Sequence, residues 1–370
     1  MSKAAFSMDR NVCLNGLSDR QTICGRKTPM PILNSVQLIA TEEGVSMTGA
    51  DSEICLSNMY PATVTENGGF CINAKKAYEI VKELPEGEVK FVARENGSVT
   101  ISGGKAVFNL ASFPVEEFPE FMFVAEETFP VDGRNLLGML DGTGYCMSQD
   151  DTKYNMNGIL LESEGMVLRA VATDGHRMAY TEDDVESEPA SNFNAPGLIL
   201  SAKTVTEMRK LIDADEPISV SLAENTIIFQ SPAFGTMVSR LVEATFPDYR
   251  RVVPENNTNV ATIDRANLVG ALRRSSIMAG INATIKMDFA DGKVVVTSND
   301  EDLGDAHEEM DIDYIGNPVS IAFASKYALD AINSFTDTQV RIILGDKLAP
   351  ALVMPVASNR KFAVIMPRSH

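Results

Sequence analysis

The sequence, 370 residues long, lacks the features that define several common classes of protein. No apolar run approaches the roughly 20 residues that a membrane span requires. The first residues, MSKAAFSMDRNVCL, contain no long apolar segment of the kind found in secretory signals. The five cysteines are odd in number, none forms a CxxC pair, and no histidine stands near them. We therefore expect no disulfide framework and no zinc site, but reduced thiols in a cytoplasmic protein.

Motifs for nucleotide binding and for hydrolytic catalysis are missing as well. Gly103-Gly104-Lys105 has neither the upstream glycine nor the following Ser or Thr of a Walker A loop, and no GxGxxG is present. No G-x-S-x-G nucleophile elbow occurs. The acidic stretch 300–313 does not have EF-hand spacing, because Gly304 stands where a ligand is needed. We therefore expect no cofactor and no metal ion.

What the sequence does contain is internal repetition. The segments INAKKAYEIVKELP, LSAKTVTEMRKLID and FASKYALDAINSF each begin with a small or polar lead-in. Apolar residues then follow at positions i, i+3, i+4 and i+7, which is the spacing of an amphipathic helix. Asn73, Ser201 and Ser325 are the residues that we expect to cap these three helices.

Strand patterns recur between the helices. Each helix is followed by short alternating segments with turn residues, which indicate antiparallel hairpins. Another strand–turn–strand pattern ends at Asp51, Asp174 and Asp300, with spacings of 123 and 126 residues. Each of these patterns is preceded by a further predicted helix, near residues 9–27, 132–147 and 264–279.

Together the two patterns predict an α+β protein with three similar domains. Each domain is expected to contain a doubled unit of one helix and antiparallel strands, over about 125 residues. We place the boundaries at residues 1–125, 126–254 and 255–370.

The net charge differs between the predicted helices and the rest of the chain. The formal net charge is −19, which taken alone argues against nucleic acid, because Lys and Arg carry the contacts to phosphate. The six predicted helices, however, carry +6 in total, which leaves −25 for the rest of the chain. Basic helices in an acidic chain suit a protein that presents one surface to phosphates and repels them elsewhere. Ordinary ion pairing on helix surfaces is the alternative for any single helix.

The stretch ATDGHRMA, residues 172–179, places an acid beside a histidine. Asp174 and His176 have the chemistry of an acid–base pair, but a catalytic triad would also need a nucleophile. Asp-Gly at the end of a strand more simply makes a tight turn. Neither Asp51 nor Asp300 is followed by a histidine, so His176 is peculiar to the middle repeat. We favour a binding loop over a catalytic site.

The end of the sequence, FAVIMPRSH, is apolar almost to its last residue. Chain ends are usually polar unless they pack against the rest of the protein. We therefore expect residues 362–366 to form a paired strand, and Met366-Pro367 to line a surface groove.

Four stretches in the same order and spacing give the sequence a specific resemblance: MPILNSVQL, ATDGHRMA, TFPDYRRVVP and VIMP. They resemble the bacterial replicative sliding clamps, the β subunits of DNA polymerase III, over essentially the whole chain. The resemblance implies a DNA replication protein without catalytic activity, which gives the polymerase its processivity. It also implies that a separate ATP-driven loader opens the protein.

The resemblance further implies a head-to-tail homodimer that closes into a ring of six domains around duplex DNA. Phe108 and Leu110 of one chain would meet Ile277 and Met278 of the other. Helices would line the hole and contact DNA without sequence preference. The residues expected to face DNA are Arg26, Lys27, Lys75, Lys76, Lys82, Tyr154, Lys203, Arg209, Lys210, Arg273 and Arg274.

A pocket for short peptides is the other implied site. In this family, the polymerase and other partners insert a short linear motif with hydrophobic anchors between the second and third domains. The matching residues here are Met156, Thr173, Gly175, His176, Arg177, Met178, Pro247, Arg251, Val252, Tyr327, Val364, Ile365, Met366 and Pro367.

The sequence departs from the family at two places. The tail Arg368-Ser369-His370 replaces a more apolar ending and predicts a more polar pocket wall. Asp150 and Asp151 add negative charge to the loop that carries Tyr154. Two other functions compete with the clamp: a hydrolase that uses Asp174 and His176, and a structural repeat protein with no role on DNA.

Overall fold

The computed structural model describes residues 4–25, 30–121, 127–189, 193, 197–280, 283–300, 302 and 304–368. The chain forms two compact units, each made of two stretches of sequence. The first unit comprises Met1–Arg134 and Thr206–Leu241, and the second comprises Asn135–Val205 and Val242–His370. The domain boundaries expected from the repeats stay a prediction.

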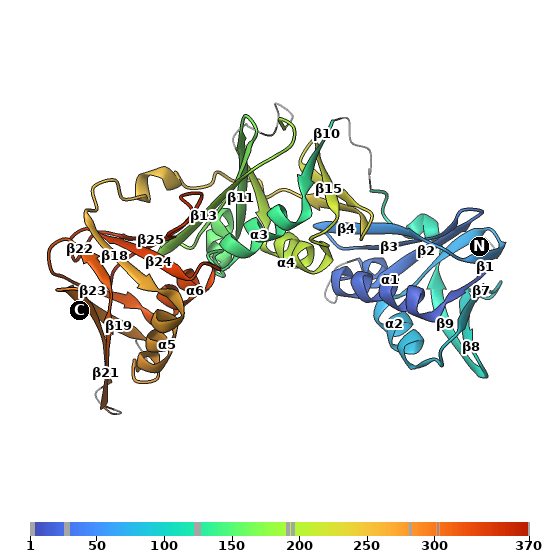
Figure 1. Cartoon of the computed structure of the whole chain (residues 1–370). Coiled ribbons are helices and arrows are strands. Elements are labelled where there is room, and N and C mark those ends of the chain that lie inside the picture. Colours follow the sequence, from blue (N-terminus) through green and yellow to red (C-terminus); the bar gives the residue numbers. More distant parts are fainter. Residues whose placement is uncertain are drawn as a thin grey trace. The chain divides into compact units, whose positions relative to one another are not determined.

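The first unit is built on one antiparallel sheet of thirteen strands. Its order is β10-β15-β16-β17-β4-β3-β2-β6-β9-β8-β7-β1-β5. Figure 1 shows its strands β2, β3 and β4 side by side. The strands are β1 (Ala5–Asp9), β2 (Ser35–Thr41), β3 (Gly44–Ala50), β4 (Ile54–Tyr60), β5 (Thr63–Glu66), β6 (Gly68–Asn73), β7 (Glu88–Ala93), β8 (Ser98–Gly103), β9 (Ala106–Phe113), β10 (Thr128–Asp132), β15 (Pro217–Ala223), β16 (Thr226–Ser231) and β17 (Gly235–Arg240).

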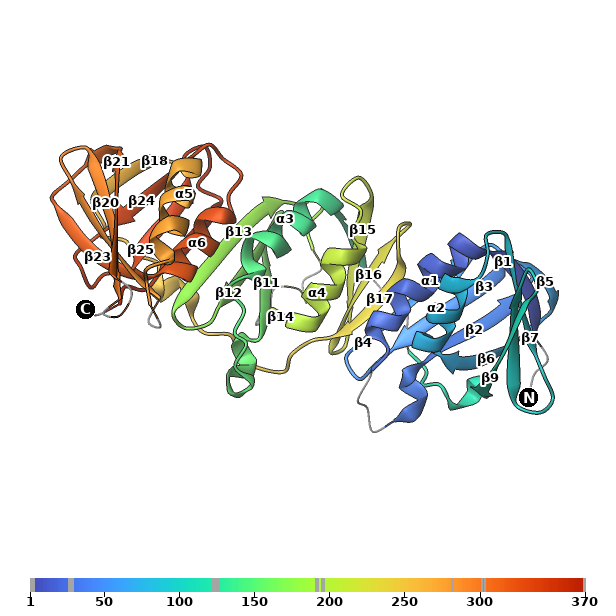
Figure 2. The ribbon, with the colours of Figure 1, turned by 90° about the horizontal axis from the view of Figure 1, so that it is seen from below.

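Two helices of the first unit, α1 (Arg10–Ile23) and α2 (Ala74–Glu83), lie side by side against this sheet (Figure 2). Each begins at a side-chain cap, because Asp9 accepts a hydrogen bond from the amide of Val12 and Asn73 accepts one from the amide of Lys76. Such caps satisfy backbone donors that the first turn leaves unpaired.

The second unit contains a nine-stranded and a four-stranded antiparallel sheet. Their orders are β14-β11-β12-β13-β26-β25-β24-β18-β22 and β21-β20-β19-β23. The strands are β11 (Gly158–Glu164), β12 (Val167–Thr173), β13 (Arg177–Asp184), β14 (Leu198–Ser201), β18 (Asn259–Asp264), β19 (Thr284–Ala290), β20 (Lys293–Asp300), β21 (Gly304–Asp311), β22 (Asp313–Ile315), β23 (Val319–Ala324), β24 (Gln339–Leu344), β25 (Ala351–Pro355) and β26 (Lys361–Ile365).

Helices α5 (Arg265–Ser276) and α6 (Ser325–Asn333) pack together in the second unit (Figure 2). Helices α3 (Gly133–Gly144) and α4 (Ala202–Leu211) each have residues in both units. No helix in the described part of the chain is long and apolar enough to cross a membrane.

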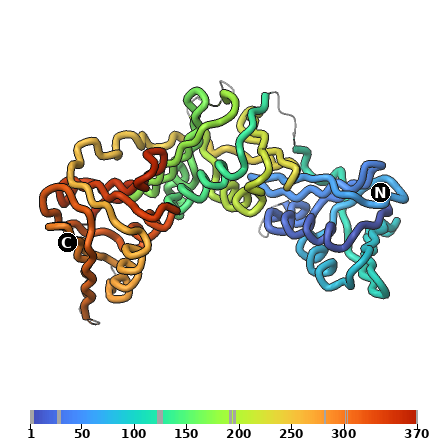
Figure 3. The backbone as a smooth tube through the Cα atoms, in the orientation of Figure 1, coloured from blue at the N-terminus to red at the C-terminus, as the bar shows by residue number. Residues whose placement is uncertain are grey.

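The backbone joins the repeats through their sheets. Strand β17 of the second repeat pairs with β4 of the first, and β26 of the third repeat pairs with β13 of the second. Figure 3 shows the second of these pairings, with the C-terminal segment beside a segment from the middle of the chain. Both pairings carry main-chain hydrogen bonds across the repeat boundary.

The six predicted helices and the predicted strand near residues 362–366 are confirmed, as is the α+β class. Asn73 and Ser201 act as the predicted caps, with Ser201 Oγ accepting from the amide of Thr204. The prediction for Ser325 is wrong. Strand β23 continues to Ala324, which takes the cap position without a side-chain bond, so Ser325 is already the first helical residue and is buried.

All five cysteines are free and buried, as the sequence predicts for reduced thiols. Burial raises the pKa of the Cys13 and Cys71 thiols to about 12, and it also raises the pKa of Cys55 and Cys146. A thiol with so high a pKa stays protonated at neutral pH and is a poor nucleophile.

We predict that none of the five thiols reacts with Ellman's reagent within minutes at pH 8 while the protein is folded. In 6 M guanidinium all five should react, which calibrates the count. Rapid reaction of even one thiol in the folded protein would contradict the buried arrangement.

Candidate functional site

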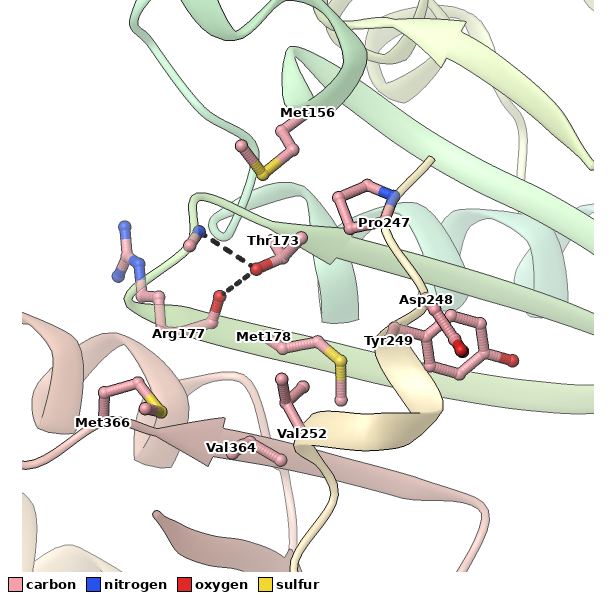
Figure 4. A pocket seen from close by; sticks show the side chains of 11 residues that line it. Met156, Thr173, Arg177, Met178, Pro247, Asp248, Tyr249, Val252, Val364 and Met366 are labelled. Atoms are coloured by element: carbon pink, nitrogen blue, oxygen red, sulfur yellow. Dashed lines mark hydrogen bonds between the residues drawn. The ribbon is translucent and has the colours of Figure 1, made fainter. Parts of the chain in front are cut away.

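A cavity of about 110 Å³ lies in the second unit, where strands β12, β13 and β26 meet two short 3₁₀ helices (Figure 4). The helices are η3 (Asp151–Met156) and η5 (Tyr249–Val252). Three methionines, two valines and a proline make most of its wall apolar. The lining residues are Met156, Thr173, Gly175, Arg177, Met178, Pro247, Asp248, Tyr249, Val252, Val364 and Met366.

The loop between β12 and β13 forms one side of the cavity and is held by its own side chains. Asp174 Oδ1 accepts hydrogen bonds from the amides of His176 and Arg177, at 2.9 and 3.1 Å. Thr173 Oγ1 accepts from the Gly175 amide and donates to the Arg177 carbonyl (Figure 4). Gly175 has φ of +89°, a conformation that residues with a side chain rarely adopt. The sequence Asp-Gly therefore builds a rigid turn here.

Arg177 fastens this loop to helix α6. Its guanidinium bonds to Asp174 at 3.0 Å and to Asp330 of α6 at 2.6 Å. It also lies over the rings of Tyr145 and Tyr327, 5.5 and 4.4 Å from their centroids. Burial lowers the pKa of Arg177, but the hydrogen bonds that it donates to Asp330 and Asp174 outweigh this effect and raise the pKa overall. Arg177 is thus a permanent cation that positions the loop.

The cavity is open to solvent at residues with large apolar side chains. Val252 is 41% exposed and Met366 is 38% exposed, and both line the cavity. Apolar side chains of this size at the mouth of a pocket lose contact with water when a ligand with apolar groups binds.

Nine of the fourteen residues expected at a peptide pocket line this cavity, and five do not. Ile365 is buried in the core instead, because side chains alternate along β26 and Val364 and Met366 occupy the cavity side. His176 stacks on Tyr327, with ring centroids 6.4 Å apart, and Arg251 pairs with Asp248. Pro367 follows the strand without reaching the wall.

Two lining residues, Asp248 and Tyr249, were missed by reasoning from the sequence. Both stand in the motif FPDYRR, next to the predicted Pro247. Tyr249 is 6% exposed, and its hydroxyl donates to Glu162 at 2.5 Å.

The geometry of Asp174 and His176 does not support the hydrolase alternative. The Asp174 carboxylate bonds to backbone amides and to Arg177, so it orients the turn and not the imidazole. The His176 ring stacks on Tyr327. Among the described residues no cluster of three or more His, Cys, Asp or Glu could hold a metal ion.

Eight of the ten basic residues expected to face DNA lie on three helices. Lys75, Lys76 and Lys82 are on α2, Lys203, Arg209 and Lys210 are on α4, and Arg273 and Arg274 are on α5. Several have acidic partners: Lys75 and Lys76 pair with Glu79, Lys210 with Glu207, and Arg274 with Glu308. Tyr154 is 61% exposed on η3. Arg26 and Lys27 lie outside the described residues.

The residues expected at a dimer interface lie beside strand edges that have no pairing partner in the described part of the chain. Strand β9, which carries Phe108 and Leu110, pairs with β8 along its length but with β6 only at Phe113 and Ser112. Strand β21 ends the four-stranded sheet, near Ile277 and Met278, which follow α5. Phe108 is 39% exposed and Ile277 is 73% exposed.

Comparison with known proteins matches the chain along its whole length. Three family models match in order: the N-terminal, central and C-terminal domains of the DNA polymerase III beta subunit, at residues 4–122, 131–248 and 250–369. The beta sliding clamp of Vibrio cholerae is 30% identical over 98% of this chain and 99% of its own, and that of Caulobacter vibrioides is 30% identical with the same coverage.

Solved structures give the same result for the fold. The DNA polymerase III subunit beta of Pseudomonas aeruginosa is 28% identical, with a TM-score of 0.92 over 99% of this chain and 100% of its own. The sliding clamp of Bacillus subtilis, 23% identical, has a TM-score of 0.94 over 100% of both chains and shows that the fold is the same.

We predict that Asp174→Ala destabilises the second unit by about 1–3 kcal/mol, because two backbone amides and Arg177 lose a common acceptor. Urea denaturation followed by circular dichroism measures this change. Asp174→Asn, which keeps the acceptor Oδ1, should lose less. An unfolding curve for Asp174→Ala identical to that of the wild type would contradict the role given to this carboxylate.

Proposed function

Because the chain belongs to the family of DNA polymerase III β subunits, the β sliding clamps, we propose that two copies close head to tail into a ring around duplex DNA. The β sliding clamp of DNA polymerase III is a processivity subunit without catalytic activity. The ring would hold the polymerase on DNA while it copies the template.

Unpaired strand edges support a head-to-tail dimer. An exposed edge invites pairing with another chain, and a closed ring removes such edges. Residues 106–111 of β9 in one chain would pair with β21 of the next. The exposed side chains of Phe108 and Ile277 would then be buried in the interface between the two chains.

The distribution of charge supports the placement of DNA. Lys and Arg residues are concentrated on helices, whereas the rest of the chain is strongly acidic. Helix charges would hold the phosphates near the centre of the ring, and the outer acidic surface would repel other DNA. Contacts with phosphate carry no sequence information, so the ring would slide at little cost in free energy.

We predict that the protein, once loaded, stays on circular DNA and leaves linear DNA by running off its ends.

A second prediction concerns the triple variant Lys75→Glu, Lys203→Glu, Arg273→Glu. We expect it to be loaded poorly and to leave DNA at a lower salt concentration than the wild type does, because each cation contributes to counterion release.

The control for this variant is Lys90→Glu, Lys286→Glu, Lys347→Glu, which changes the net charge equally but on strands and a loop. It should load like the wild type. Gel filtration of loaded complexes measures retention. Equal retention on circular and linear DNA would reject topological binding. Equal loss of loading in both variants would reject the proposal that the basic helices face the DNA.

The apolar cavity supports the binding of a short peptide with hydrophobic anchors. Three thioethers, two valines and a proline give a deformable apolar wall, and the Asp174 turn supplies a fixed edge. A buried Leu or Phe anchor contributes roughly 1.5–3 kcal/mol, so a few anchors reach micromolar affinity, near −8 kcal/mol. Affinity of this order suits a polymerase, a clamp loader and other partners that exchange on the same ring.

We predict that Val252→Asp weakens the binding of such a peptide by about tenfold or more, because a charge then lies at the apolar mouth. Val356→Asp is the matched control, since Val356 is 42% exposed and lies away from the cavity. Fluorescence anisotropy with a labelled peptide measures the affinity. If both variants bind like the wild type, the cavity is not the peptide site.

A further inference from the structure

The sequence contains four Asn-Gly pairs, at residues 15–16, 67–68, 96–97 and 157–158. In such a pair, the backbone nitrogen of the glycine can attack the side-chain carbonyl carbon of the asparagine before it. Glycine has no Cβ, so its nitrogen is the least shielded from this approach. Closing the five-membered ring requires the backbone of the pair to rotate. The surrounding structure therefore decides which pair reacts.

Three of the pairs lie in backbone that secondary structure holds. Gly16 is inside helix α1, where the hydrogen bonds of the helix fix the backbone. Gly68 begins strand β6 and lies opposite Ala40 of β2. Gly158 is buried at the start of β11, opposite Ser201. Rotation at any of these pairs would disturb a helix or a sheet.

The fourth pair, Asn96 and Gly97, lies in the turn between β7 and β8. Asn96 is exposed to solvent, and Gly97 has φ of +78°, a conformation that favours glycine. The Gly97 amide donates one hydrogen bond, to the Arg94 carbonyl, at 3.3 Å. This distance is longer than a typical N–H···O bond, so the bond is weak. Of the four pairs, this one has the backbone that rotates most readily.

Two donors of Ser98 already polarise the side chain of Asn96. The Asn96 Oδ1 atom accepts a hydrogen bond from the Ser98 hydroxyl at 2.7 Å and another from the Ser98 amide at 3.2 Å. Attack on the carbonyl carbon moves negative charge onto this oxygen. Donors that are already in place stabilise such a charge as it develops. Ser98 therefore lowers the barrier to ring closure.

We propose that Asn96 is a site of self-modification, at which the side-chain amide becomes a carboxylate without an enzyme. The Gly97 nitrogen loses its proton to water and bonds to the Asn96 Cγ atom. The bond from Cγ to the side-chain nitrogen then breaks, and ammonia leaves. Water adds to either carbonyl of the cyclic imide and opens it, which gives aspartate or isoaspartate. One water is consumed and one ammonia is released, and nothing is oxidised or reduced.

Both products change the surroundings of strand β9. Each adds one negative charge to a chain whose net charge is already −19. Isoaspartate also lengthens the backbone of the turn, because the chain then runs through Cγ. The Gly97 carbonyl in this turn accepts a hydrogen bond from the Ser112 amide of β9 at 3.0 Å. The modification thus alters the support of β9, although its chemistry does not depend on the proposed ring.

Mass spectrometry of the folded, full-length protein tests this proposal. The protein is aged at pH 8 in H₂¹⁸O and digested in ordinary water at pH 6, and the peptides that contain the four pairs are compared. Conversion during ageing adds about 3 Da, because one ¹⁸O enters from water, whereas earlier conversion adds about 1 Da. We expect Asn96 to be converted about tenfold faster than the asparagine of any other pair, because its turn is free to reach the reactive geometry.

Variants and the unfolded chain provide the controls. Ser98→Ala removes the hydroxyl donor and should slow the conversion of Asn96 about threefold or more. Ser98→Thr keeps a hydroxyl and should keep the rate. In 6 M guanidinium the four pairs should react at similar rates, because the structure no longer distinguishes them.

Three results would overturn the inference. If Asn96 reacts no faster than Asn67 and Asn157 in the folded protein, the turn is not a reactive site. If the same difference between the pairs persists in guanidinium, the local sequence selects Asn96 and the structure does not. If Ser98→Ala reacts like the wild type, the hydroxyl does not stabilise the charge on Oδ1.

Discussion

The pairing of β13 with β26 determines the wall of the apolar cavity. It places residues 361–365 opposite residues 177–181, nearly two hundred positions earlier in the chain. Because side chains alternate along each strand, the register decides which residues meet. Met178 and Val364 line the apolar cavity, and Tyr180 and Phe362, two residues along each strand, stack on each other. A shift of one residue would move the side chains of one strand to the opposite face of the sheet and remove this wall of the cavity.

Electrostatics supports this backbone arrangement locally. Arg177 reaches from the end of β13 to Asp330 on α6 and to Asp174 in its own loop, with tyrosine rings on either side. Glu162 accepts a hydrogen bond from the hydroxyl of Tyr249, and Glu182 accepts one from the hydroxyl of Tyr180. Arg177 and the carboxylates that it contacts are thus paired, which lowers the cost of placing charged groups where the local dielectric is low.

Much of the fold follows from the sequence, because apolar spacing and turn residues are local signals. The six helices and the terminal strand were predicted from such patterns, and Asn73 was identified as a cap. Ser325 was misassigned because the preceding strand extends one residue further than its pattern suggests. The site was only partly predictable. Ile365 was expected in the pocket although the alternation along a strand places it in the core. The stacking of Tyr180 on Phe362 leaves no local signal, since it exists only through the register of two distant strands.

The proposed ring joins two chains of 40.1 kDa. Single-particle electron microscopy of the purified protein, combined with sedimentation equilibrium, measures its assembly without further assumptions. We expect a dimer that forms a ring with a central hole wide enough for a DNA duplex. Open monomers at micromolar concentration, with the basic helices on their outer surface, would contradict it.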